Sequence, residues 1–174
     1  MKGMKSMLLN LAPILHEPGG IVPFSFTMDF SDMVLGGICP ASEPVSINGQ
    51  VKNEAGVLIL TANLKTTLHC VCDRCATAYL EAYDQQVEAI LVSELAHQEN
   101  EDDWTFLLQG SDADLEDIMN TAFILNLDSK MLCSADCKGL CGTCGKNLND
   151  GPCDCKKELD PRLAVLKQLL KDKE

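Results

Sequence analysis

The first two-thirds of the chain show the residue alternation that is typical of β-strands. From Val57 to Cys70, every second position is apolar or small, and polar residues such as Asn63 and Lys65 occupy the positions between them. Residues two apart point to the same face of a strand, so this stretch predicts a strand with one buried face. Similar patterns predict strands over residues 23–30, 44–52, 78–93 and 104–108. The positions expected to face the core are Phe24, Phe26, Met28, Phe30, Val45, Ile47, Gly49, Val51, Leu58, Leu60, Ala62, Leu64, Thr66, Leu68, Cys70, Tyr79, Tyr83, Val87, Ala89 and Leu91.

Two turn signals join these strands into hairpins. Asn53-Glu-Ala-Gly56 separates the second and third predicted strands. Cys72-Asp-Arg-Cys75 separates the third from the fourth, so the second hairpin would carry a cysteine pair at its tip. Cys70 falls on the apolar face, where we expect a small buried side chain.

Helical spacing appears in the last third of the chain. Ser111 or Asp112 is expected to cap a helix whose apolar positions are Leu115, Ile118, Met119, Ala122, Phe123 and Leu125. Asp160-Pro161 is expected to open a second helix with a leucine stripe over residues 163–170. This stripe either packs on the sheet, which we favour, or docks on a partner.

Together these patterns predict an α+β fold: a mainly antiparallel β domain, two helices and a C-terminal cysteine-rich module. We expect residues 1–110 to form the β domain with the first cysteine pair. We expect residues 111–174 to contain the helix, the cysteine-rich segment and the C-terminal helix, packed on the first part.

Eight of the ten cysteines fall into four close pairs, which is the spacing of thiolate metal sites. Structural zinc explains this pattern best, whereas disulfides would require an oxidising compartment and redox-active thiols are a further alternative. The N-terminus resembles a signal peptide only weakly, because Asn10 and Pro13 interrupt its apolar run. The proposed zinc ligands are Cys72, Cys75, Cys133, Cys137, Cys141, Cys144, Cys153 and Cys155.

The eight thiols can be divided in two ways. In the division we favour, Cys141, Cys144, Cys153 and Cys155 bind one Zn²⁺ within a short loop, and the other four bind a second. The alternative is one zinc bound by Cys137, Cys141, Cys144 and either Cys153 or Cys155. Cys39 and Cys70 are left over, and His69 is an unfavoured alternative ligand. The basic residues expected to offset the thiolate charge are Arg74, Lys138, Lys146 and Lys156.

The chain is strongly acidic, with 26 acidic and 14 basic residues and a formal charge of −12. Such a charge disfavours non-specific binding to nucleic acid or to an anionic membrane surface. Residues 81–117 contain twelve acidic residues and no Lys or Arg. This run is either a solvated face or a docking surface for a basic partner.

Catalytic motifs are lacking in the sequence. It contains no phosphate-binding glycine loop, no G-x-S-x-G and no H-E-x-x-H. A zinc ion held by four thiolates also keeps no open position for water or substrate. We therefore expect no enzymatic activity, and no small-molecule substrate.

Several segments, beginning with the N-terminal Leu-Asn-Leu-Ala-Pro motif, resemble the bacterial YceD family, also described as large ribosomal RNA subunit accumulation proteins. The resemblance is carried by residues 9–20, 67–75, 112–128, 132–149 and 160–166. It implies a cytoplasmic ribosome-biogenesis factor that is needed for normal 23S ribosomal RNA levels. The expected partner is a ribosomal protein or a pre-large-subunit particle, with weak direct RNA contact and no membrane. A thiol-based redox or zinc-responsive regulator is the alternative function.

Overall fold

The computed structural model describes residues 7–33, 41, 43–93 and 104–155, which belong to two compact units. The first, which we call the β unit, comprises Met1–Cys70 and Ala78–Met131. The second, the cysteine unit, comprises Val71–Thr77 and Leu132–Glu174. The sequence suggested a single boundary at residue 110, whereas this division places the helix after that residue in the β unit and the first cysteine pair in the cysteine unit.

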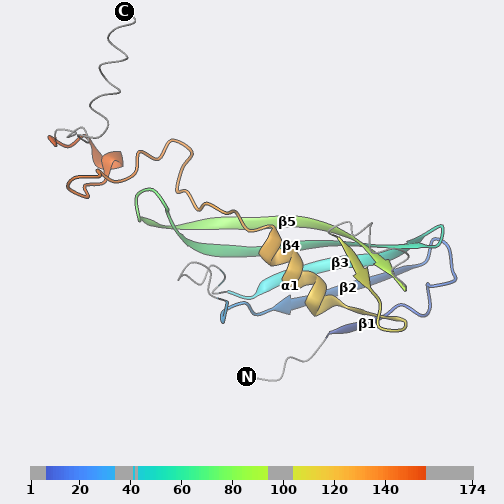
Figure 1. Cartoon of the computed structure of the whole chain (residues 1–174). Helices are drawn as coiled ribbons and strands as arrows, with labels where there is room; N and C mark the ends of the chain where they lie inside the picture. The colour runs from blue at the N-terminus through green and yellow to red at the C-terminus, as the bar shows by residue number, and fades with distance from the viewer. Residues whose placement is uncertain (1–6, 34–40, 42, 94–103, 156–174) are drawn as a thin grey trace, which may run out of the picture. The chain divides into compact units, whose positions relative to one another are not determined.

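A five-stranded sheet with the order β2-β3-β4-β5-β6 dominates the β unit (Figure 1). Its strands are β2 (Ile21–Met28), β3 (Val45–Glu54), β4 (Val57–Val71), β5 (Ala78–Val92) and β6 (Thr105–Leu107). The β2–β3 and β3–β4 pairs are antiparallel, as expected. However, β6 runs parallel to β5, so the sheet is mixed.

The predicted inward faces of the long strands are the buried ones. On β4, Leu58, Leu60 and Leu64 are almost inaccessible to solvent, whereas Thr61 and Lys65 are exposed. The sheet packs closely at Gly49 on β3, because a Cβ atom there would meet the Thr61 carbonyl oxygen and lie 2.6 Å from Phe24 Cζ. The period-two pattern therefore identified the core face of the sheet correctly.

The helix begins later than the sequence suggested. Helix α1 spans Leu115–Leu125, and its N-cap is Asp114 rather than Ser111 or Asp112. The Asp114 carboxylate accepts hydrogen bonds from the backbone N–H groups of Glu116 and Asp117, both at 3.2 Å. The preceding residues form strand β7 (Asp112–Asp114), which pairs antiparallel with β1 (Leu8–Asn10). This small two-stranded sheet was not expected.

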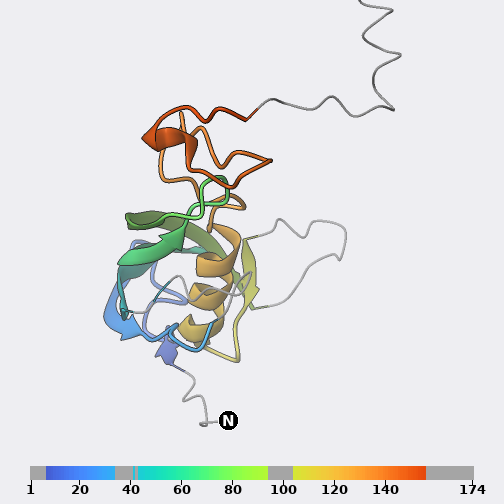
Figure 2. The same ribbon diagram turned by 90° about the vertical axis from the view of Figure 1, so that its left-hand side faces the viewer.

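Helix α1 lies across one face of the five-stranded sheet, as the two views show together (Figure 1, Figure 2). Phe123 occupies the centre of this contact, stacked on Phe30 at 4.3 Å between ring centroids and edge-on to Tyr83 at 5.2 Å. Met119 is also fully buried, so the Met and Phe stripe belongs to the core. Leu125 was expected there too, but it is 60 % exposed because it lies in the last turn of the helix.

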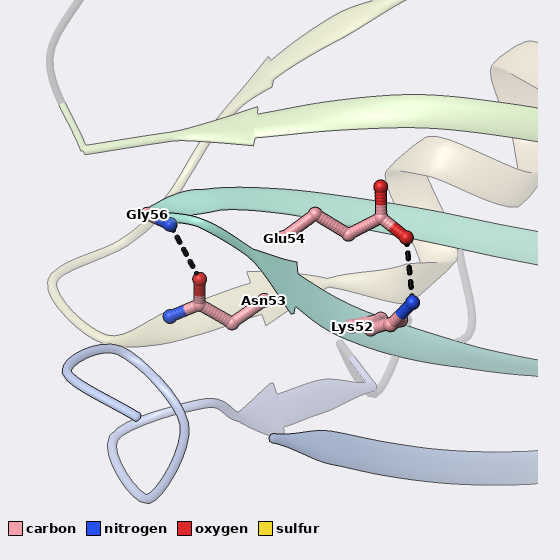
Figure 3. Close-up of polar contacts among 4 residues, drawn as sticks. All are labelled: Lys52, Asn53, Glu54 and Gly56. Atoms are coloured by element: carbon pink, nitrogen blue, oxygen red, sulfur yellow. Dashed lines mark hydrogen bonds and ion pairs between the residues drawn. The ribbon is translucent and has the colours of Figure 1, made fainter. Parts of the chain in front are cut away.

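A buried asparagine fastens the N-terminal segment to the sheet. Asn53, at the end of β3, is 1 % exposed and donates through Nδ2 to the carbonyl oxygens of Ile14 at 2.6 Å and Leu15 at 3.2 Å. Its Oδ1 accepts the Gly56 N–H at 2.8 Å and closes the predicted turn (Figure 3). Leu11 and Ile14 are buried in the core, so this part of the N-terminal segment belongs to the fold.

The cysteine unit contains little regular structure among its described residues. A single 3-10 turn, η1 (Leu148–Asp150), interrupts the loops of residues 132–155 (Figure 2). The expected helix from Asp160 onward lies outside the described residues, and α1 is the one α-helix within them. Across the part of the chain that is described, no helix combines the length and the apolar character required to span a membrane.

Candidate metal centres

Eight cysteine sulfurs gather into two groups of four in the cysteine unit. The first thiol group consists of Cys72, Cys75, Cys133 and Cys137, and the second of Cys141, Cys144, Cys153 and Cys155. Within each group, all sulfur atoms lie within 4.8 Å of one another, so each group could hold a metal ion. These are the two sets that the favoured division of the cysteines predicted. The single-site alternative would place Cys137 with Cys141, whereas the Cys137 sulfur lies in the first group.

The sulfur spacing fits a tetrahedral ion. Zn–S bonds of about 2.3 Å place tetrahedral sulfurs about 3.8 Å apart. In the first group, Cys72 Sγ lies 3.7 Å from Cys137 Sγ, and Cys75 Sγ lies 3.6 Å from Cys133 Sγ. Both distances far exceed a disulfide bond of about 2.05 Å, and every described cysteine is a free thiol.

The two Cys-x-x-Cys turns share one backbone pattern. The Cys72 N–H donates to the Thr77 carbonyl at 2.9 Å, and the Ala76 N–H donates back to the Cys72 carbonyl at 2.8 Å. The second turn repeats both bonds, from Cys141 to Lys146 at 2.8 Å and from Gly145 to Cys141 at 2.9 Å. The fifth residue of each turn has a positive φ, 55° at Ala76 and 72° at Gly145. Two separate stretches of chain therefore form the same knuckle, each presenting two sulfurs from one tight turn.

Arg74 joins the two halves of the first thiol group. Its guanidinium donates to the carbonyl oxygens of Cys137 at 3.0 Å and Ala135 at 3.3 Å. Its own carbonyl oxygen accepts the Leu140 N–H at 3.0 Å. Gly139 passes beside this carbonyl at φ 74°, and a Cβ atom there would lie 3.0 Å from the Arg74 oxygen. The approach therefore favours glycine both sterically and conformationally.

Backbone N–H groups favour the thiolate form of selected cysteines. The Cys133 N–H, assisted by those of Cys75 and Arg74, lowers the pKa of Cys72 to about 6. The N–H groups of Cys144 and Thr143 lower the pKa of Cys141 to about 6. The Asn149 side chain lowers the pKa of Cys137 in the same way.

Cys133 and Cys155, which lie close to other thiols, hold their protons more tightly. Hydrogen bonding to the Cys75 and Cys72 side chains raises the pKa of Cys133 to about 12, and hydrogen bonding to Cys144 raises that of Cys155 to about 12. Four thiols this close cannot all become thiolates unless a cation balances their charge. Because metal ligands are thiolates, the donor set fits a soft or borderline dication.

Two of the remaining sequence candidates, Cys70 and His69, belong to neither thiol group. Cys70 is buried in the β unit, with Sγ 3.8 Å from Met131 Sδ, and burial raises its pKa. His69 is exposed and belongs to neither group. Cys39 lies outside the described residues.

The polar residues next to the sulfurs differ from those expected. Arg74 and Lys146 donate to backbone carbonyls, Lys146 to that of Pro152 at 2.8 Å, and Lys156 lies outside the described residues. Two side chains that contact sulfur were not among those expected: Asn149, with Nδ2 3.3 Å from Cys137 Sγ, and Thr77, with Oγ1 3.3 Å from Cys75 Sγ. Sequence reasoning overlooked both, because asparagine and threonine near turns have an ordinary explanation as turn residues.

Comparison with known proteins places these features in a family. The model of the family described as "Large ribosomal RNA subunit accumulation protein YceD" matches residues 60–170, a span that includes both thiol groups. No curated protein and no solved structure matches the chain. The match covers 111 of 174 residues, so the chain belongs to the YceD family.

Proposed function

We propose that this member of the YceD family is a non-catalytic, zinc-binding accessory factor in large ribosomal subunit biogenesis, required for accumulation of 23S ribosomal RNA. The observation that carries the proposal is the family match over residues 60–170. The chemistry of the two thiol groups also supports the proposal, since each group consists of four cysteine thiols and no histidine or carboxylate.

Zinc suits these donors better than other common divalent cations. Calcium and magnesium prefer oxygen ligands, whereas tetrahedral thiolate sets are typical of structural zinc. The first thiol group would hold one ion and the second another. With four protein ligands each, neither ion would retain a free position for water or substrate, which supports a structural role.

The described residues of the cysteine unit have little else to hold them together. Among these residues, the buried ones are Cys72, Cys75, Cys137 and Gly139, so the described part of the unit has no apolar side-chain core. In metal-dependent modules of this kind, the free energy of metal binding serves as folding free energy. Zinc would therefore give the unit the fixed surface that a binding factor requires.

A basic partner fits the charge of the chain. Ribosomal proteins are mostly basic, and a net charge of −12 steers such partners toward the surface. The described part of the acidic run 81–117 does not form one continuous face. Asp84 and Glu88 lie on the exposed face of β5, opposite to its buried residues. Asp114, by contrast, caps α1. We therefore propose residues 94–103, which lie outside the described residues, as the main contact.

Depletion in the native cell tests the biological role. We expect mature 23S RNA to fall relative to 16S RNA, and large subunits to fall or stall as precursors. The protein should be cytoplasmic and should sediment with free or pre-large-subunit particles more than with translating ribosomes. Unaltered subunit profiles after full depletion, in fast growth and in the cold, would contradict the role.

A matched pair of variants tests the proposed contact. The first neutralises Glu99, Glu101, Asp102 and Asp103 together. The second removes the same charge from the exposed residues Glu17, Asp32, Glu43 and Asp150. We expect the first variant to lose particle association and the second to keep it, both with unchanged zinc content. Equal loss in both would show that total charge, rather than this segment, governs the association.

A redox- or zinc-responsive regulator is the second candidate. The observation that favours it is the exposure of Cys133 and Cys144, one in each thiol group, which leaves them open to oxidants. A switch should release zinc and change partners at low micromolar peroxide, whereas a purely structural site should keep its metal.

A further inference from the structure

We propose that the two metal centres are coupled, with the loop of the second centre completing the surroundings of the first through Asn149. This inference rests on the proposed zinc occupancy of both thiol groups. It assigns a positioning residue that lies outside the eight cysteines.

Asn149 belongs to the loop of the second group but contacts the first. It lies in η1, within the eight residues that separate Cys144 from Cys153. Its Nδ2 donates to Cys137 Sγ at 3.3 Å, and its Oδ1 accepts the Lys138 N–H at 2.8 Å. One amide thus holds the backbone beside Cys137 and places a donor against its sulfur.

Asn147 makes a second link between the same loop and the first group. Its Nδ2 lies 3.4 Å from Thr77 Oγ1, which in turn lies 3.3 Å from Cys75 Sγ. Its Oδ1 accepts from Asn149 Nδ2 at 2.8 Å and from the Asn149 N–H at 3.0 Å. When Cys75 is a metal-bound thiolate, the Thr77 hydroxyl has to donate to it, and the Asn147 amide then donates to Thr77. The two asparagines therefore orient each other and both thiolate donors.

The backbone connects the loop to the first group over a short path. Three residues separate Cys137 from Cys141, and Gly139 accepts the Leu148 N–H at 2.9 Å. Leu140 pairs with Asn147 in an isolated antiparallel bridge. Closing the second thiol group brings Cys144 and Cys153 together and fixes the turn that carries both asparagines. An open loop would leave Cys137 without its donor.

Donors around metal ligands commonly change metal affinity by about 10–100-fold when they are removed. We therefore expect Asn149→Ala to weaken metal binding at the first group by that factor. In the Cys75→Ser background, where the first group is open, the same change should leave the metal affinity of the second group unchanged. Opening the second group with Cys144→Ser should weaken the first group by a similar factor. Since both changes remove the same contact, the double variant should bind metal at the first group no more weakly than Cys144→Ser alone.

Cadmium-113 NMR on the full chain can follow each centre separately. Cys75→Ser and Cys144→Ser assign the two resonances, and competition with a chelator gives the affinity of each centre. Asn149→Asp keeps the oxygen that accepts from Lys138 but replaces the donor with a like charge. Because this change also removes the donation from Asn149 Nδ2 to Asn147 Oδ1, the metal affinity of the second group in the Cys75→Ser background reports whether the loop still closes. A thiolate donor predicts lost affinity at the first group while that second-group affinity is kept. Asp150→Ala is the matched control, because it alters the exposed neighbouring side chain of the same turn.

The outcomes separate this inference from the zinc proposal. The coupling would be overturned if Asn149→Ala kept the wild-type metal affinity of the first group. It would also be overturned if the affinity losses of the two single variants added in the double variant. Either result would leave the zinc proposal standing. A chain that binds neither cadmium nor zinc would overturn both. Lost metal affinity at the first group in Asn149→Ala, Asn149→Asp and Cys144→Ser, with no further loss in the double variant, would establish the coupling, provided that Asp150→Ala is unchanged and far-ultraviolet circular dichroism is preserved.

Discussion

The two thiol groups should contribute unequally to stability because they close loops of different length. Cys75 and Cys133 are 58 residues apart, and the intervening chain contains β5, β6, β7 and α1. Cys144 and Cys153 are 9 residues apart. The chain-entropy relation for cross-links gives about 4 kcal/mol for the longer loop and about 2.5 kcal/mol for the shorter. We therefore expect opening the first group with Cys75→Ser to cost about 1.5 kcal/mol more in unfolding free energy than opening the second with Cys144→Ser.

Urea unfolding and amide hydrogen exchange measure this difference at zinc concentrations that keep the unmutated group filled. Cys75→Ser should speed exchange throughout α1 and β5, whereas Cys144→Ser should affect mainly residues 141–155. Excess chelator provides the control, because the cross-links exist only when metal is bound, so the wild type and both variants should then converge. Equal and purely local effects of the two variants, or a difference that persists in chelator, would refute the reasoning.

Three further predictions concern metal, core and charge. Protein purified without chelator should carry close to two zinc ions per chain by elemental analysis, and less than half an ion with pairwise-oxidised thiols would contradict the proposed sites. Asn53→Ala should lower the unfolding free energy by about 2–4 kcal/mol in a urea melt, because it leaves the buried carbonyl of Ile14 and the Gly56 N–H without their partner (Figure 3). At physiological salt, random RNA should bind with a Kd of about 1 µM or weaker, since the chain carries a charge of −12; tight and steeply salt-dependent binding would contradict this.

Local periodicity explains why the main sheet could be predicted from the sequence. In a strand that is buried on one face, apolar residues recur at every second position. Strand β4 keeps this alternation over most of its length. The division of the cysteines was equally accessible, because a Cys-x-x-Cys turn brings its two sulfurs together whatever the surrounding fold. Four such short-range pairs leave few ways to make two sites of four.

Contacts between distant residues explain what the sequence did not reveal. Strands β1 and β7 have three residues each, and Leu8 pairs with Asp114 across more than a hundred positions. Strands this short have no detectable residue alternation in the sequence. The Asp residues before α1 also resemble an ordinary helix start. The true N-cap is Asp114 because Asp112 and its neighbours are held in β7, where Asn10 Nδ2 donates to Asp112 Oδ1 at 2.6 Å. Tertiary pairing thus moved the start of the helix.

The asparagines of the cysteine unit show where such reasoning has to turn from sequence to geometry. Asn147 caps η1 through its side chain, which is sufficient reason for an asparagine at the start of a turn. Nothing in its local sequence indicates that the same residue reaches Thr77, seventy positions earlier. The cysteines decide which metal the unit can bind, but the eight residues between Cys144 and Cys153 decide what surrounds the other centre. If the loop is shortened while all eight cysteines are kept, the sulfur count is unchanged, yet the first centre loses the Asn149 donor. We therefore expect spacer length, and not cysteine number alone, to determine whether a chain of this type holds two ions with matched affinity.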